Sequence, residues 1–165
     1  VRWLMAELPV FPTSRYKHMA GLLCSICPAS EIAYTAASTK TALLLTAPAN
    51  QRLLVVQFGI TTDLSSPVAV PGVLTIYKAT TAGTFTSVTP VLLSAGSETP
   101  QATAGSNATV EPTQGNVIRR IHLDRGFWEA RAIDLRLVVP GGTRLGFKLY
   151  TPSGINVLPW IEYEE

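Results

Sequence analysis

The residues of this chain that could carry out chemistry begin with one cysteine pair, Cys24-Ser25-Ile26-Cys27. A zinc site needs about four ligands, but no second pair follows, and the only histidines are His18, shortly before the pair, and the distant His122. A thioredoxin-like site would need a βαβ pattern around the cysteines, and the sequence lacks one. Structural thiols are therefore the favoured interpretation, while a local disulfide and a metal or redox role stay open.

Signatures of catalytic centres are missing from the sequence. It has no G-x-S-x-G, G-x-x-x-x-G-K-[ST], H-E-x-x-H or D-x-D-x-D-G motif, and two histidines cannot supply the ligand set of a cupin-like metal barrel. Glu129 with Asp134, or Glu162 with Glu164, could form a carboxylate pair. Solvated carboxylates are the commoner case for such residues. We therefore expect a protein that is not an enzyme and that uses no cofactor or metal.

Composition narrows the classes of partner. The chain has 165 residues, 47% of them hydrophobic and only 15% charged, and a formal net charge of +2. Nucleic-acid binding normally requires a basic face, and Arg119-Arg120 is the only adjacent basic pair. No apolar stretch reaches the roughly 18 residues that span a bilayer. These observations predict neither nucleic acid nor membrane as a partner. Low charge is typical both of a protein that contacts other subunits and of a robust extracellular or particle-borne β-protein.

The elements that must position these residues are strands, and the pattern is clearest from Ala132 to Glu165. Because side chains alternate between the two faces of a strand, three half-buried strands are predicted there. Pro140-Gly141-Gly142 and Thr151–Gly154 should form the turns between them. Pro159 indicates an edge position or a bulge in the last strand. The expected inward residues are Leu135, Leu137 and Val139, then Leu145, Phe147 and Leu149, then Val157 and Ile161.

Further strands are expected along most of the remaining chain, at 31–48, 51–62, 73–79, 85–93 and 117–124, with Leu43-Leu44-Leu45 as a buried centre. Ser94–Asn116 is predicted to be a long loop, and Arg125–Glu129 a turn with two aromatic residues. The fold class is therefore all-β: a two-sheet antiparallel sandwich of jelly-roll type. An immunoglobulin-like sandwich is the alternative, but the Cys…Trp…Cys spacing is lacking.

An extended arm is predicted to precede the sandwich. Residues 1–30 contain three prolines and apolar residues without a period, so we expect an arm over residues 1–30 and a single β-sandwich domain over residues 31–165. The arm could pack along its own domain or reach onto a neighbouring subunit. The candidate interface comprises the loop Glu98–Glu111 and the residues Trp3, Leu4, Phe11, Tyr16, Met19 and Trp160.

Three stretches carry a resemblance to a known group of proteins. They are LTIYKATTAGTFTSVTPVLLSAGSETPQATA (Leu74–Ala104), LVVPGGTRLGFKLYTPS (Leu137–Ser153) and WIEYEE (Trp160–Glu165). In style and order they resemble small β-sandwich structural proteins of tailed-bacteriophage virions. The resemblance implies a capsid decoration (cement) protein that binds across subunits of the major capsid protein. It also implies a homo-oligomer, with a trimer favoured, and a location in the virion.

Two other hypotheses are kept. The first is a carbohydrate- or receptor-binding β-sandwich module of a virion or a secreted protein. It requires exposed aromatic residues on one face, for which the candidates are Tyr77, Tyr150, Trp160 and Tyr163. The second is a small jelly-roll enzyme, which would require a bound metal.

Overall fold

The computed structural model describes residues 21–63, 71–93, 96–123, 127–131 and 137–165, and all regular structure in these ranges is β-strand. No helix among the described residues is long and apolar enough to cross a membrane. The strands are β1 (Leu23–Ile26), β2 (Ile32–Tyr34), β3 (Ser38–Thr46), β4 (Leu53–Thr62), β5 (Gly72–Ala79), β6 (Thr84–Val88), β7 (Val91–Leu92), β8 (Thr103–Val110), β9 (Gln114–Leu123), β10 (Phe127–Arg131), β11 (Val138–Val139), β12 (Arg144–Thr151) and β13 (Ile155–Glu164).

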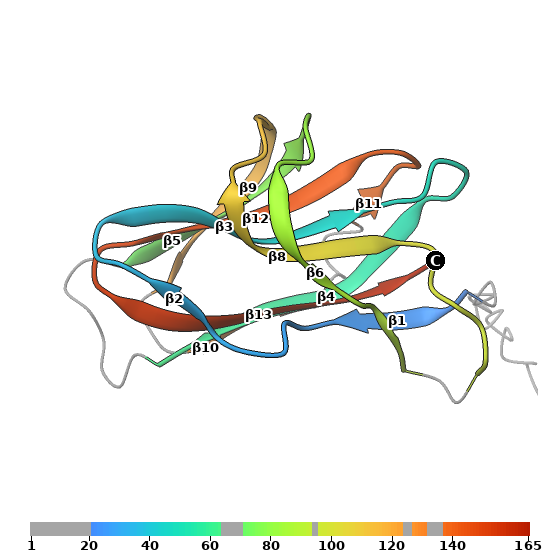
Figure 1. Ribbon diagram of the computed structural model, residues 1–165, viewed down its shortest axis with the longest axis horizontal. Helices are drawn as coiled ribbons and strands as arrows, with labels where there is room; N and C mark the ends of the chain where they lie inside the picture. The colour runs from blue at the N-terminus through green and yellow to red at the C-terminus, as the bar shows by residue number, and fades with distance from the viewer. Residues whose placement is uncertain (1–20, 64–70, 94–95, 124–126, 132–136) are drawn as a thin grey trace, which may run out of the picture.

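The strands form two antiparallel sheets that face each other (Figure 1). The seven-stranded sheet has the order β10-β4-β13-β1-β7, with β11 also paired to β4 and β2 to β13. The six-stranded sheet has the order β6-β8-β3-β12-β5-β9. The predicted all-β, two-sheet antiparallel sandwich is therefore confirmed.

The core between the sheets follows the predicted alternation. Leu145, Phe147 and Leu149 on β12 are buried, as are Val157 and Ile161 on β13. Each such side chain contributes about 1.5–3 kcal/mol when it leaves water completely. The central run of β3 lies in the same interior, where Leu43 and Leu45 are fully buried. The two sheets are joined by aromatic packing of Phe58 against Phe147, whose ring centroids are 5.2 Å apart.

The predicted boundary between arm and domain at residue 30 is wrong. Residues 23–26 form β1, which pairs with β13 on one side and β7 on the other. Cys24 and Ile26 on β1 are fully buried, so the sandwich includes this segment. Only two inward side chains mark so short a strand, and Pro28 follows two residues after it. The predicted arm residues Trp3, Leu4, Phe11, Tyr16 and Met19 lie outside the described residues.

The predicted long loop over residues 94–116 is also wrong, because its centre is β8. This strand pairs with β3 on one side and β6 on the other. The small residues of β8 resemble a linker in composition. At Gly105, however, a larger residue would not fit, because another side chain packs closely on it. A Cβ atom at Gly105 would lie 2.5 Å from the Cβ of Phe85. Most of the expected interface segment Glu98–Glu111 is therefore an interior strand of the six-stranded sheet.

Two predictions about strands of the seven-stranded sheet, one for β10 and one for β13, need correction. The expected turn Arg125–Glu129 is strand from Phe127 onward, since β10 pairs with β4. Pro159 lies in β13, which is a central strand, and is not at a bulge. It is still placed where one side of β13 has no partner, because pairing with β2 ends at Val157 and pairing with β1 begins at Ile161. This interval tolerates a residue without an N–H group.

Candidate functional site

A groove with a volume of about 420 Å³ lies on one side of the sandwich, between the two sheets. One wall is the β1–β2 connection, Cys27–Ile32. The other wall is Thr86–Thr89, from the end of β6, together with Ser106 and Asn107 of β8. The walls come from three separate parts of the sequence, so sequence reasoning did not identify this site.

The strand β6 forms a free edge along the groove. Among the strands that the structure describes, it pairs with β8 alone, at the end of the six-stranded sheet. A strand edge presents main-chain N–H and C=O groups that can pair with another strand. Thr86 and Ser87 are exposed on this edge. The groove can therefore offer main-chain hydrogen bonds from one wall.

Asn107 gives the groove an unusual backbone. Its φ of 56° lies in the left-handed region, which non-glycine residues seldom adopt. The pairing of β6 with β8 shifts at this point, between Thr84 and Thr86. The side-chain oxygen Oδ1 of Asn107 is buried and has no hydrogen-bond partner among the described residues. A polar atom in this state is costly in a folded protein.

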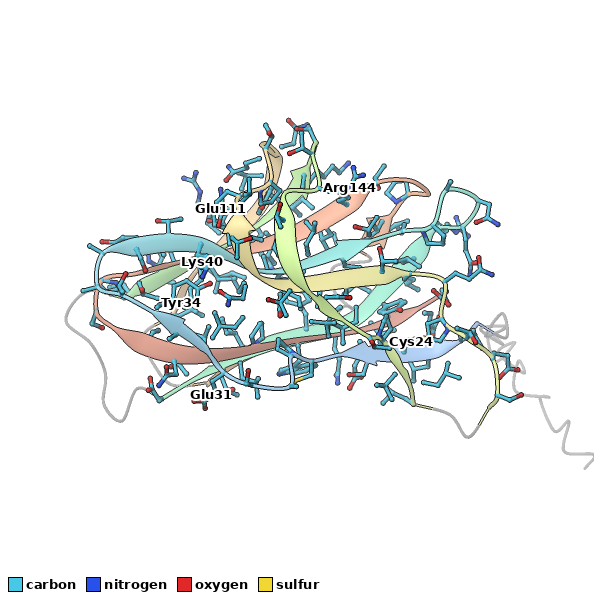
Figure 2. All side chains as sticks on the ribbon, in the orientation of Figure 1. Cys24, Glu31, Tyr34, Lys40, Glu111 and Arg144 are labelled. Atoms are coloured by element: carbon cyan, nitrogen blue, oxygen red, sulfur yellow. The ribbon has the colours of Figure 1, made fainter. Side chains whose placement is uncertain are left out.

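Polar side chains line much of the groove, and one of them is acidic. Glu31 carries the only ionisable carboxyl group among the lining residues, which contain no basic or aromatic side chain. Glu31 lies at the lower edge of the molecule in Figure 2. The free thiol of Cys27 is exposed at the surface, yet the groove walls remove part of its hydration and raise the pKa of this thiol.

The cysteine pair is split between core and surface. Cys24 is fully buried and its sulfur lies 3.7 Å from the Leu22 carbonyl oxygen. Burial raises the pKa of the Cys24 thiol. Both cysteines are free, so the local disulfide is not formed, and Cys24 is a core thiol. The described residues contain no group of three or more His, Cys, Asp or Glu side chains that could hold a metal ion.

Glu111, Thr41 and Tyr77 form a hydrogen-bonded cluster at β3, which we call the polar clamp. The pairing of β8 with β3 ends at Ser106 opposite Leu43, so Thr41, which still pairs with Lys148 of β12, has no strand partner on the β8 side. The Glu111 carboxylate takes that place: its two oxygens accept from the Thr41 N–H (2.9 Å) and the Thr41 hydroxyl (2.6 Å). The Thr41 Oγ1 is also 2.8 Å from the Tyr77 hydroxyl. Glu111 is labelled in Figure 2.

Truncating this clamp should destabilise the protein measurably. Glu111→Ala leaves the fully buried Thr41 without its acceptor, so the free energy of unfolding should fall by about 1–3 kcal/mol. Glu111→Gln keeps one acceptor oxygen and should cost less. The exposed Glu98 supplies the control, because Glu98→Ala should stay within about 0.5 kcal/mol. Urea unfolding measures all three variants, and equal effects of Glu111→Ala and Glu98→Ala would contradict the clamp.

The buried tyrosines predict alkaline sensitivity. Loss of hydration raises the pKa of Tyr77 to about 12 and that of Tyr34 and Tyr163 further still. In the unfolded chain these hydroxyls lose their protons near the ordinary value of 10.0. Above that pH the unfolded state holds fewer protons, so stability falls as pH rises. The thermal midpoint should decrease between pH 10 and about 12, and Tyr77→Phe should flatten the slope; a midpoint independent of pH there would refute the assignment.

The outer face of the seven-stranded sheet exposes several large apolar side chains. Leu54 and Val138 are cross-strand partners there and are 39% and 42% exposed. Val91 on β7 is 62% exposed. Trp160, which the sequence also places in the candidate interface, is partly buried on the same face. Its ring lies over Gly59, where a Cβ atom would be 2.6 Å from the ring.

The predicted aromatic platform is not formed as expected. Tyr77 and Tyr163 are fully buried, so they are unavailable for stacking on a sugar. Tyr150 belongs to the six-stranded sheet and Trp160 to the seven-stranded sheet, so these two lie in different layers of the sandwich. No protein-family model, curated protein or solved structure matches this chain.

Proposed function

We propose that this chain is a structural virion protein of the capsid decoration (cement) type, which binds across subunits of the major capsid protein and stabilises the particle. The observation that carries the proposal is the apolar outer face of the seven-stranded sheet. Leu54, Val91, Val138 and Trp160 meet water on this face in the isolated chain. Apolar surface of this kind is favourable when it packs against another protein, and aromatic residues with a polar group are enriched at such contacts.

The proposal includes a jelly-roll topology, which the order of strand pairing supports. The pairings are nested: β5 with β9, β4 with β10, β3 with β12, and β1 and β2 with β13. A chain that folds into one long hairpin and then rolls up produces this nesting. The additional pairings β4 with β13 and β5 with β12 join neighbouring layers of the rolled hairpin. Virus capsid proteins commonly use this architecture.

The proposed mechanism is physical. The sandwich supplies a rigid body, and the apolar face and the residues before β1 supply contacts to neighbours. Each contact is weak alone, but a homo-oligomer, with a trimer favoured, presents several at once, and linked contacts multiply the overall affinity. The protein would act in the virion, without nucleic acid or membrane as a partner.

Density-gradient sedimentation of the native source material, with the chain tracked by mass spectrometry, tests the proposal. We expect the chain to travel with a large particle in a fixed ratio to a shell protein. Trp160→Ala should release it from the particle, while Tyr150→Ala, on the other sheet, should not. A chain that stays at the top of the gradient as a small species refutes the structural role.

The second candidate function is a carbohydrate- or receptor-binding module, and the polar groove favours it. Hydroxyl groups of Ser30, Thr86, Ser87 and Thr89 line the groove together with Glu31. Such groups suit a ligand that forms many hydrogen bonds. A glycan-array screen of the purified chain tests this function: binding that is lost in Glu31→Gln and retained in Glu98→Gln supports it.

A further inference from the structure

The edge strand β6 lacks two of the devices that protect edge strands, charged residues and prolines, although it is short and its pairing with β8 shifts between Thr84 and Thr86. Natural proteins block exposed edges with charged residues, prolines or covering segments. The strand β6 has the sequence TFTSV, without charge or proline. The opposite edge of the same sheet, β9, carries the exposed residues Arg119 and Arg120. An edge without charge or proline beside an open groove can accept a further strand.

The dimensions and charge of the groove restrict what that strand can be. A groove of about 420 Å³ holds a few extended residues and no folded element. Its β6 wall can donate and accept main-chain hydrogen bonds, as in recognition by strand addition. Its opposite wall carries Glu31 and no basic residue. A complementary strand is therefore short, extended and basic.

The chain itself contains such a segment. Residues 13–19, Thr-Ser-Arg-Tyr-Lys-His-Met, include Arg15 and Lys17 and no acidic residue. Two residues that are separated by one position share a face of a strand, so both cations would point to the same side of an added strand. Pairing of either cation with Glu31 would fix the register of the strand in the groove.

The direction of the chain assigns this segment to another copy. Pairing with the C-terminal end of the chain continues to Leu22, whose N–H donates to the Glu165 carbonyl oxygen (2.9 Å) and whose carbonyl oxygen accepts from the Glu165 N–H (3.1 Å). Leu22 therefore lies at the end of β1 that is away from Cys27 and the groove. Residues 13–19 lie two to eight residues before Gly21, so their far end can extend about 26 Å beyond it, which is enough to reach a molecule that packs against this end of the sandwich.

We propose that the β6 edge of one copy binds residues 13–19 of a second copy as an added strand, with Arg15 or Lys17 paired to Glu31. The inference rests on the proposed function in that it names the contact between copies of the homo-oligomer. It requires no capsid, so it can be tested on the purified chain.

The exposed thiol of Cys27 allows a direct test in the full-length protein, since Cys24 is buried. Thr13→Cys and Met19→Cys each place a thiol on the strand face that carries Arg15 and Lys17, towards the wall that holds Glu31 and Cys27. Mild oxidation with a copper catalyst and air joins neighbouring thiols. We expect disulfide-linked dimers and larger chains on a non-reducing gel, and their loss when Cys27→Ser is added. Glu98→Cys is the control at an unrelated exposed position. Monomers with an internal disulfide, or equal crosslinking of the control, would overturn the proposal.

A charge exchange tests the same contact without crosslinking. Glu31→Lys should weaken self-association by about tenfold in sedimentation velocity, because like charges now meet. Arg15→Glu combined with Lys17→Glu should restore association in the Glu31→Lys background. Glu98→Lys, which makes the same charge change elsewhere, should have no effect. Failure of the restoration refutes the assigned partner.

The outcomes separate this inference from the proposed function. A chain that travels with a particle but gives no inter-chain disulfide retains the structural role and loses the strand exchange. A chain that crosslinks as expected but stays at the top of the gradient retains the strand exchange and loses the virion role.

Discussion

Replacing Tyr77 with alanine is expected to lower the free energy of unfolding by about 3–5 kcal/mol, out of the roughly 5–15 kcal/mol that holds a typical domain together. Tyr77 is fully buried although it lies outside the main core. Its ring lies over Gly146 of β12, where a Cβ atom would be 2.5 Å away. Leu44, Ala79 and Phe85 form a second small apolar cluster with it.

Truncation of Tyr77 would remove several contacts at once. The ring would leave a cavity in the second cluster, and the Tyr77 hydroxyl, 2.8 Å from the Thr41 Oγ1, would be lost from the polar clamp. The Nζ of Lys148, which lies 5.2 Å from the ring centroid, would lose its aromatic partner. These losses explain why one residue on the outer face of a sheet should affect stability as strongly as a residue of the main core.

Urea unfolding of three variants measures this prediction. Tyr77→Phe keeps the ring and removes one hydrogen bond, so it should cost about 1 kcal/mol. Tyr150→Ala changes a partly exposed tyrosine on β12 and should cost clearly less than Tyr77→Ala. Comparable losses for Tyr77→Ala and Tyr150→Ala would show that the second cluster contributes little to folding.

Strands with large, regularly alternating side chains could be predicted from the sequence. The three apolar residues of β12 and those of β13 identify the inner face because a period of two is visible in each. The second cluster was not predicted, since Tyr77 occupies an outward position and was interpreted as an exposed aromatic residue. The available signal was Gly146 within the neighbouring strand, because a glycine inside a strand indicates close approach of another group.

The strand β8 and the groove were missed for different physical reasons. Alanine, glycine, serine and threonine in β8 have low β-propensity or resemble a loop in composition, and only tertiary packing against Phe85 and β3 explains them. The groove unites Cys27–Ile32, Thr86–Thr89 and Asn107, which are too distant in sequence for any local pattern to connect. Trp160 was predicted on the outer face of its strand, and the structure describes it there.

Deleting residues 1–20 is expected to abolish assembly while the sandwich remains folded. Main-chain pairing of the described chain begins at Leu22 and its buried core at Cys24, so the deletion ends before the first core contact. The variant should keep the β-type circular dichroism spectrum and a cooperative thermal transition of the full-length chain. It should lose self-association in sedimentation velocity and should no longer travel with a particle on the gradient.

Two further variants show which part of the deleted segment matters. If strand exchange drives association, replacing Arg15 and Lys17 with glutamate should reproduce most of the loss, because these residues face Glu31 in the proposed contact. Replacing Trp3 and Leu4 with serine removes the apolar residues at the other end of the segment and tests their predicted interface role separately. If the deletion instead removes the folded β spectrum, residues 1–20 belong to the core of their own domain, and both the exchanged strand and the arm across neighbours are refuted.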